Sequence, residues 1–228
     1  MSRPVWRISG LPKGRPAEAV ALSAAPAPSH RSSDVCRNNP LSTCAHFWES
    51  DAHSKKSVVF VKRLILMRHA KSDWSATGDD HSRPLNGRGK DSAQAMGRWL
   101  AAQGWVPDEV LCSTSARTRQ TLALLGLPQV PTRYERALYL AEADEIIDTL
   151  RSATEDTVLL LGHNHGIAEC ANALVSKAPN HPRFRDYPTC ATSLIRFDVA
   201  HWSDLREGTG ACEAFTVPRE LIAERHSG

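Results

Sequence analysis

The sequence lacks two features that would place it in familiar classes of protein. No apolar run approaches the roughly 18 residues of a membrane-spanning helix, so we expect no membrane partner. The chain also lacks any CxxC pair, and its six cysteines are far apart: Cys36, Cys44, Cys112, Cys170, Cys190 and Cys212. This spacing argues against a disulfide framework and against a ribbon-type zinc site. It favours a reducing compartment, and we therefore expect a cytoplasmic protein.

The body of the chain also lacks an excess of basic residues. The 228 residues carry a formal net charge of +3, but residues 1–57 hold 8 Lys and Arg against 4 Asp and Glu. The remaining 20 basic and 21 acidic side chains give the body a net charge of −1. Because binding to a phosphate backbone needs a basic face, we expect no nucleic-acid partner.

Residues 1–57 lack the sustained apolar pattern of a folded domain. They contain six prolines and many Ser and Ala residues, and such a segment buries too little surface to offset its ordering entropy. We predict a disordered leader. The alternatives are an organelle-targeting segment, since the first third is rich in Arg and poor in acid, or an upstream-extended start. The leader's Cys36, Cys44, His46 and His53 match no common zinc spacing, so we predict no metal site there.

From Val58 onwards, short apolar runs alternate with segments of helical spacing. The runs predict strands at 58–67, 108–113 and 156–162 and, by its polar–apolar alternation, an edge or half-exposed strand at 192–199. The helical spacing predicts helices at 86–104, 115–127, 144–153 and 164–176. This order predicts an α/β fold, a three-layer α/β/α sandwich with a mostly parallel central sheet, in one domain at 58–228.

Basic and imidazole side chains follow three of the predicted strands. Arg68 and His69 come after the first, residues 113–117 after the second, and His163 after the later apolar strand. In such sheets, ligands bind beyond the carboxyl ends of the strands, where helix N-termini also offer N–H donors. The pattern therefore predicts an anion site, most simply for a phosphoryl group, because the planar fork of Arg meets two oxygens at once.

Four motifs in this order resemble the histidine phosphatase superfamily, the phosphoglycerate mutase-like group. They are "LMRHAKSDW", "RPLNGRG", "CSTSARTRQT" and "LLLGHNHG". The opening motif is most similar to the small phosphohistidine phosphatase branch, the SixA type. The resemblance covers about residues 62–200 and does not include the leader.

The resemblance implies a role for each of four catalytic residues. His69 is the expected nucleophile, which becomes phosphorylated, and Arg68 and Arg117 are the expected clamps on the phosphoryl oxygens. His163 is the expected second imidazole facing the phosphate. The chemistry agrees, because nearby guanidinium groups lower the pKa of an imidazole and keep it nucleophilic. They also supply the positive charge, so we expect no metal and no cofactor.

Two residues compete with these assignments. Arg119 lies two residues from Arg117 on a predicted helix and faces a different side, and the motif favours Arg117. His165 competes with His163 but occupies a position at which the family pattern has proline. We expect His165 at the rim of the site or at the start of a helix.

The rest of the opening motif leaves alternatives. Lys71 and Ser72 are expected substrate-binding residues, with plain solvation as the equal alternative. Asp73 either caps a turn or meets the substrate.

A general acid for an alkyl phosphate ester is not evident from the sequence. Glu135, Glu142 and Asp144 are candidates, and exposed helix charges are the favoured interpretation of all three. The resemblance to the SixA-type branch implies phosphohistidine on a partner protein as the substrate, and a compact site without an acid suits its good leaving group. The alternatives are a small-molecule phosphomonoesterase and, from another class, a non-catalytic module that binds a phosphorylated ligand.

Overall fold

The computed structural model describes residues 60–224, so the predicted leader at 1–57 and its candidate metal ligands lie outside the described part. The strands are β1 (Lys62–Arg68), β2 (Glu109–Ser113), β3 (Thr132–Glu135), β4 (Thr157–Gly162), β5 (Thr192–Phe197) and β6 (Ala211–Thr216). The α-helices are α1 (Gly87–Ala102), α2 (Ala116–Leu124), α3 (Ala143–Arg151), α4 (Gly166–Leu174) and α5 (Pro218–Glu224). Two short 3-10 helices are η1 (Arg136–Leu138) and η2 (Trp202–Asp204). Within residues 60–224, no helix has the length and apolar character needed to cross a membrane.

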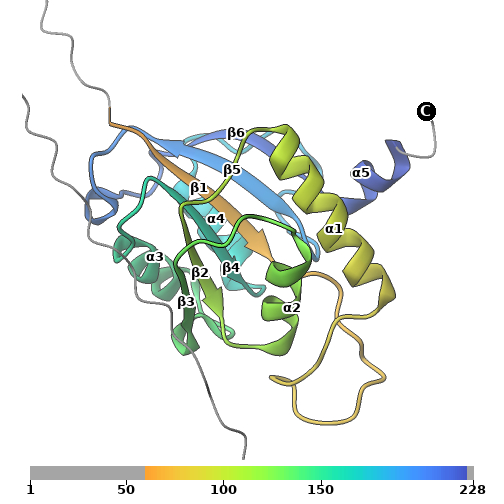
Figure 1. The fold of residues 1–228 in the computed structure, drawn as a ribbon. Coiled ribbons are helices and arrows are strands. Elements are labelled where there is room, and N and C mark those ends of the chain that lie inside the picture. The colour runs from red at the N-terminus through yellow and green to blue at the C-terminus, as the bar shows by residue number, and fades with distance from the viewer. Residues whose placement is uncertain (1–59, 225–228) are drawn as a thin grey trace, which may run out of the picture. The chain divides into compact units, whose positions relative to one another are not determined.

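The six strands form one sheet in the order β3-β2-β4-β1-β5-β6 (Figure 1). Strands β3, β2, β4 and β1 are parallel neighbours, whereas β5 runs antiparallel to β1 and β6 antiparallel to β5. Arg68 at the end of β1 lies in register with Gly162 at the end of β4. The carboxyl ends of β1, β4 and β2 therefore meet at one edge of the sheet, which is where ligands bind in such folds.

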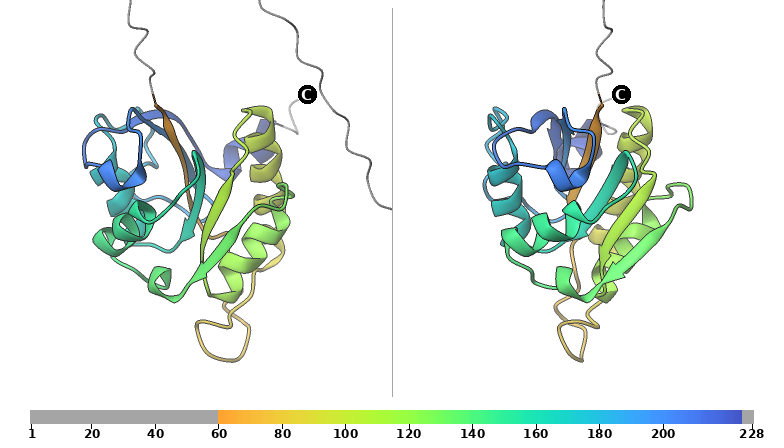
Figure 2. Two further views of the ribbon diagram at one scale, coloured as in Figure 1. Left: turned by 60° about the vertical axis from the view of Figure 1, so that its left-hand side comes forward. Right: turned by 90° about the vertical axis from the view of Figure 1, so that its left-hand side faces the viewer.

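Helices cover both faces of the sheet (Figure 2). Helices α1, α2 and α5 lie on one face, and α3 and α4 on the other. Successive residues of β1 point into opposite cores: Leu64 and Leu66 into one, Ile65 and Met67 into the other. All four are fully buried, which explains why residues 64–67 of the strand are all apolar. The predicted three-layer α/β/α sandwich with a mostly parallel sheet is confirmed.

The prediction of an edge or half-exposed strand at 192–199 is wrong. Strand β5 lies between β1 and β6, and five of its six residues are buried. Its first two residues, Thr192 and Ser193, are small, polar and fully buried, and Ser193 Oγ accepts a hydrogen bond from the Tyr187 hydroxyl at 2.8 Å. Polar residues at the start of this strand therefore form hydrogen bonds inside the fold and do not mark a face that is exposed to solvent. Strands β3 and β6 and helix α5 were not predicted.

Two of the sequence motifs fix the starts of the helices beside this edge. Asn86 caps α1, because its side-chain oxygen accepts from the Gly89 N–H at 2.9 Å. Ser115 caps α2 by accepting from the Thr118 N–H. A Cβ on Gly89 would lie only 2.1 Å from the Lys71 carbonyl oxygen. Glycine thus lets α1 pack directly against the segment that follows β1.

Candidate active site

Three parallel strands deliver predicted site residues to the same edge of the sheet. Arg68 is the last residue of β1, and Ser113 is the last residue of β2. His69 is held on both sides: its N–H donates to the Gly162 carbonyl at 3.1 Å, and its carbonyl accepts from the Cys190 N–H at 3.0 Å. The candidate nucleophile therefore sits on backbone that is fixed by two other segments of the fold.

The hydrogen bonds of His69 fix its tautomer. Its Nδ1 lies 2.7 Å from the Ala70 carbonyl oxygen, which can only accept, so Nδ1 carries the proton. The lone pair of the neutral ring is then on Nε2. Burial lowers the pKa of His69 well below its usual value, and the nearby charges of Arg117 and Arg68 lower it further. His69 is thus a neutral imidazole with a free nitrogen, as nucleophilic attack on phosphorus requires.

His163 is also fixed as a neutral ring. Its Nδ1 lies 3.2 Å from Arg117 Nη2, which can only donate, so Nδ1 is the unprotonated nitrogen. Its Nε2–H donates to Ser113 Oγ at 2.8 Å. Burial, followed by the charge of Arg117, lowers the pKa of His163 to about 3. The ring centroids of His69 and His163 are 5.1 Å apart, so the two imidazoles line one small space.

Arg117 is buried beside His163, whereas Arg119 is not. The Arg117 side chain is 2% exposed, and its two terminal nitrogens donate to Asp80: Nη1 to the carbonyl at 2.5 Å and Nη2 to the carboxylate at 3.0 Å. Arg119 is exposed, and its guanidinium lies over the Tyr134 ring at 4.5 Å from the centroid. Of the two arginines, Arg117 is the one that contacts the histidines of this edge.

Both site arginines keep a buried donor without an acceptor among residues 60–224. Arg68 Nη1 donates to the Tyr187 carbonyl at 3.0 Å, but Arg68 Nε has no partner there, and neither has Arg117 Nε. An unpaired buried N–H is costly, and buried polar groups are otherwise almost always satisfied. A ligand with several acceptor oxygens, such as a phosphoryl group, fits these two donors.

Asp80 and Tyr139 are contacts of the site that the sequence patterns missed. The Tyr139 hydroxyl donates to Asp80 Oδ2 at 2.6 Å, and its ring packs edge-on against His163 with centroids 5.3 Å apart. The Tyr139 hydrogen bond, with the charge of Arg117, lowers the pKa of Asp80 to about 2. Asp80 comes from the loop between β1 and α1, directly before the "RPLNGRG" motif. That proximity to a motif was its only signal in the sequence.

Comparisons with known proteins identify the family. The model of the histidine phosphatase superfamily (branch 1) matches residues 64–142. An uncharacterised protein from Mycobacterium tuberculosis is 36% identical over 160 residues, which are 67% of this chain and 100% of the relative. The chain belongs to the histidine phosphatase superfamily. Its activity is accordingly that of a phosphatase.

Two further relatives refine the place of the chain in the superfamily. A structure from Nakamurella multipartitia, assigned as a phosphohistidine phosphatase SixA, superposes with a TM-score of 0.63 at 30% identity, covering 69% of this chain and 96% of that one. An uncharacterised chloroplastic protein from Arabidopsis thaliana is 31% identical over 190 residues, 77% of this chain and 82% of its own length. Within the superfamily, this phosphatase is of the SixA type.

The remaining residues of the opening motif lie around the phosphatase site in different ways. Asp73 caps a turn: its carboxylate accepts from the Ser75 N–H at 2.9 Å and from the Ser75 hydroxyl at 2.7 Å. Ser72 is buried and pairs with Leu85 in an isolated β-bridge. The half-buried Lys71 lines a groove beside α1. His165 is exposed at the N-cap of α4.

Two of the three acidic candidates, Glu135 and Glu142, have contacts within their own elements. Glu135 accepts from Arg133 Nε at 3.0 Å at the end of β3. Glu142 is the N-cap of α3, with the reciprocal hydrogen bonds of a capping box, and Asp144 lies in the first turn of that helix. The carboxylate that contacts Arg117 is instead that of Asp80.

Proposed function

We propose that this phosphatase removes the phosphoryl group from phosphohistidine on a partner protein, through a phosphorylated His69. Arg68 and Arg117 hold the phosphoryl oxygens, and the Nε2 lone pair of His69 attacks phosphorus. The P–N bond of the substrate breaks, and its electron pair leaves with the substrate imidazole, which takes up a proton. Water then attacks phosphorus on His69 and releases inorganic phosphate, so that the imidazole is restored.

The protonation state of Asp80 is the observation on which the substrate proposal depends. Its pKa of about 2 keeps it ionised, so it holds no proton to give to a leaving group. Of the other acidic candidates, Glu135 accepts from Arg133 at the end of β3, Glu142 caps α3, and Asp144 lies in the first turn of α3. An alkoxide leaving group needs a proton donor in the site. The ring of phosphohistidine can instead take a proton from solvent on its other nitrogen, because an imidazole ring has an ordinary pKa of about 6.5, and it then leaves as neutral imidazole when the P–N bond breaks. This supports phosphohistidine over an alkyl phosphate ester.

Two substrates offered in parallel test the proposal. We expect the wild-type chain to dephosphorylate a histidine-phosphorylated protein with a higher kcat/KM than an alkyl phosphate monoester. Equal or faster turnover of the alkyl ester would replace the proposal with a small-molecule phosphomonoesterase. Tight binding of the phosphoprotein without any turnover would indicate a non-catalytic module.

The His69→Ala variant tests the covalent step. Because the attacking nitrogen is removed, we expect turnover of a chromogenic phosphate ester to fall by at least about a thousandfold, and the acid-labile phosphoenzyme to be absent. Arg119→Ala is the matched control, since Arg119 lies on the exposed side of α2. In this variant, the ester turnover and the amount of phosphoenzyme should both stay within about twofold of the wild type. Phosphoenzyme in His69→Ala would assign the nucleophile to another residue.

We also propose the cytoplasm as the place of action. Cys112, Cys170 and Cys190 are buried free thiols, which is typical of a reducing compartment. The Arabidopsis thaliana relative, described as chloroplastic, supports organelle targeting as the alternative. Imaging the full chain fused at its C-terminus to a fluorescent protein distinguishes the two.

A further inference from the structure

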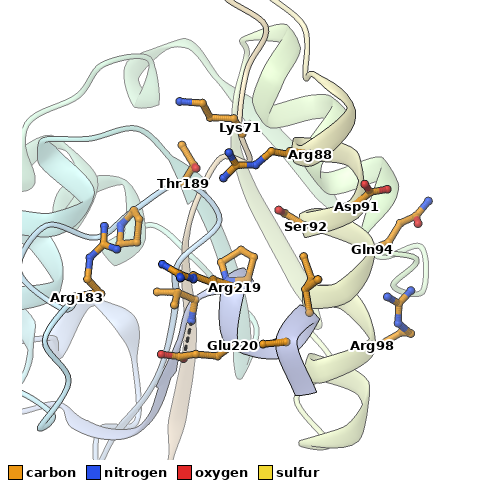
Figure 3. A pocket seen from close by; sticks show the side chains of 15 residues that line it. Lys71, Arg88, Asp91, Ser92, Gln94, Arg98, Arg183, Thr189, Arg219 and Glu220 are labelled. Atoms are coloured by element: carbon orange, nitrogen blue, oxygen red, sulfur yellow. Dashed lines mark hydrogen bonds between the residues drawn. The ribbon is translucent and has the colours of Figure 1, made fainter. Parts of the chain in front are cut away.

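A groove of about 1260 Å³ runs between α1 and α5 and begins beside the active site (Figure 3). Lys71 and Thr189 line one end of it, and Arg98 lies toward the other, with Arg219 between. Lys71 is two residues from His69, and Thr189 precedes Cys190, whose N–H holds the His69 carbonyl. The groove and the phosphorylation site are therefore joined by a few residues of backbone.

The groove carries an excess of positive charge without partners. Lys71, Arg88, Arg98 and Arg219 line it, and within the described range 60–224 none of these four forms an ion pair. Asp91 is the unpaired acid among the lining residues, which leaves three net positive charges.

The other two charged lining residues are already engaged. Glu220 pairs with His181 at 2.8 Å, and Arg183 pairs with Asp186 at 2.7 Å. Counting every charged lining residue, five basic against two acidic, also leaves three net positive charges. The charge excess stands out because the body of the chain is close to neutral.

The dimensions of the groove suit a peptide better than a metabolite. Its volume exceeds the roughly 300–1,000 Å³ of ordinary small-molecule pockets. Arg88 and Arg98 are ten residues apart on α1, which is about 15 Å along a helix and matches about five residues of extended chain. A single phosphate would contact only a small part of this surface.

We propose that this groove binds an acidic segment of the phosphorylated partner protein and thereby directs its phosphohistidine to His69. The proposal rests on the proposed function for its substrate. Attraction between the acidic segment and the unpaired arginines raises the rate of encounter and favours partners with the right charge pattern. Asp91 and the near-neutral body disfavour a nucleic acid, which needs a broad basic face.

Steady-state kinetics of a double variant test the groove. In Arg88→Glu/Arg219→Glu we expect KM for the histidine-phosphorylated protein to rise about tenfold or more at low ionic strength. Turnover of a chromogenic phosphate ester should stay within about twofold, which also reports that the chain is folded. Arg206→Glu is the matched control, because it reverses an exposed charge on the face of the sheet that carries α3 and α4, and it should leave KM unchanged. An unchanged KM in the double variant overturns the proposal.

A binding measurement separates failure of the groove from failure of the proposed function. The probe is a fluorescent ten-residue Glu-rich peptide without phosphate, followed by anisotropy with the full chain. We expect binding that weakens with salt and that falls about tenfold in the double variant but not in Arg206→Glu. Because residues 1–57 carry a net charge of +4, only this difference between variants counts. This binding measurement tests the groove even if the chain turns over no phosphohistidine protein.

Two results of the binding measurement overturn the proposal. One is equal binding of the peptide by the wild type and the double variant. The other is a single-stranded oligonucleotide of equal charge that binds more tightly than the peptide and loses this binding in the double variant.

Discussion

At the scale of single residues, the site is defined by which nitrogens carry protons. The acceptor-only carbonyl of Ala70 holds the proton of His69 on Nδ1, and the donor-only guanidinium of Arg117 keeps it off Nδ1 of His163. Both rings are therefore neutral and face a region with surplus N–H donors. A bound phosphate dianion raises the pKa of both imidazoles, so phosphate binding and proton uptake are coupled.

The Asp80→Asn variant is expected to bind inorganic phosphate more tightly. Asp80 pairs with Arg117 at 3.0 Å, and its negative charge would oppose a phosphate dianion at the same guanidinium. Removing that charge should lower the Ki of phosphate, measured as inhibition of ester turnover, by about tenfold. Asp73→Asn is the control: it lies in the same loop but caps a turn through Ser75, and its Ki should not change. A higher Ki in Asp80→Asn would mean that the carboxylate chiefly positions Arg117 for phosphate.

The two neutral histidines are expected to make stability depend on pH. The pKa of His163 is about 3 in the folded chain and that of His69 is well below its usual value, whereas both are about 6.5 when unfolded. As the pH falls below 6.5, the unfolded chain binds protons that the folded chain does not. The free energy of unfolding should therefore decrease, by up to about 1.4 kcal/mol per pH unit for each histidine.

Urea unfolding between pH 7.5 and pH 5 measures this slope. Asp80 does not contribute in this window, because it titrates between about pH 3.8 unfolded and about 2 folded. The His163→Asn variant should show a smaller slope than the wild type. An equal slope in both would show that His163 takes up its proton equally in the two states.

At the scale of helices and strands, Gly89 allows α1 to pack closely against the segment that carries His69, the proposed nucleophile. A Cβ on Gly89 would lie 2.1 Å from the Lys71 carbonyl oxygen, and the backbone there cannot yield easily. Gly89→Ala should therefore lower the free energy of unfolding by about 1–3 kcal/mol. It should also reduce ester turnover, because Lys71 is two residues from His69.

Gly87→Ala is the matched control for that prediction. Gly87 lies in the same helix, and an added Cβ there would meet no other group of residues 60–224 within 4 Å. Stability should therefore be equal or slightly higher, as for other exposed helical glycines. Urea unfolding of both variants measures this difference in the free energy of unfolding. Equal stability of Gly89→Ala and Gly87→Ala would mean that α1 can shift away from Lys71 without cost.

The elements differ in how well the sequence predicted them. Strand β1 was predictable because both faces of its centre are buried, which produces the apolar run at 64–67. Strand β6 was not, because five of its six residues are exposed or only partly buried and show no periodic pattern. The position of β5 was misjudged, because Thr192 and Ser193 satisfy their hydroxyl groups inside the fold.

The site residues also differ in whether a sequence pattern marks their positions. Arg68, His69 and His163 could be located because each lies at the end of a strand, and the sequence shows where the apolar run of that strand stops. Asp80 and Tyr139 meet only when the β1–α1 loop closes over the end of η1, and loop closure leaves no periodic signal. The sequence could thus indicate the candidate site at the strand ends but not Asp80, the carboxylate that pairs with Arg117.

At the scale of the whole molecule, the active site draws its contacts from one compact part of the chain. The residues that form it extend from Arg68 to Cys190, and residues 54–228 form one compact unit. The Mycobacterium tuberculosis relative corresponds over its full length to 67% of this chain. We therefore propose that residues 58–228 are the catalytic domain and that the leader is dispensable for chemistry.

Deletion of residues 1–57 is therefore expected to leave kcat/KM for a chromogenic phosphate ester within about twofold. Every hydrogen bond that fixes the protonation of His69 and His163 lies inside the retained chain. His69→Ala in the shortened chain should show no turnover, which confirms that the same site is being measured. A shortened chain that keeps its circular dichroism spectrum but loses ester turnover would place part of the phosphatase machinery in the leader. Loss of the spectrum as well would instead assign the leader a role in folding.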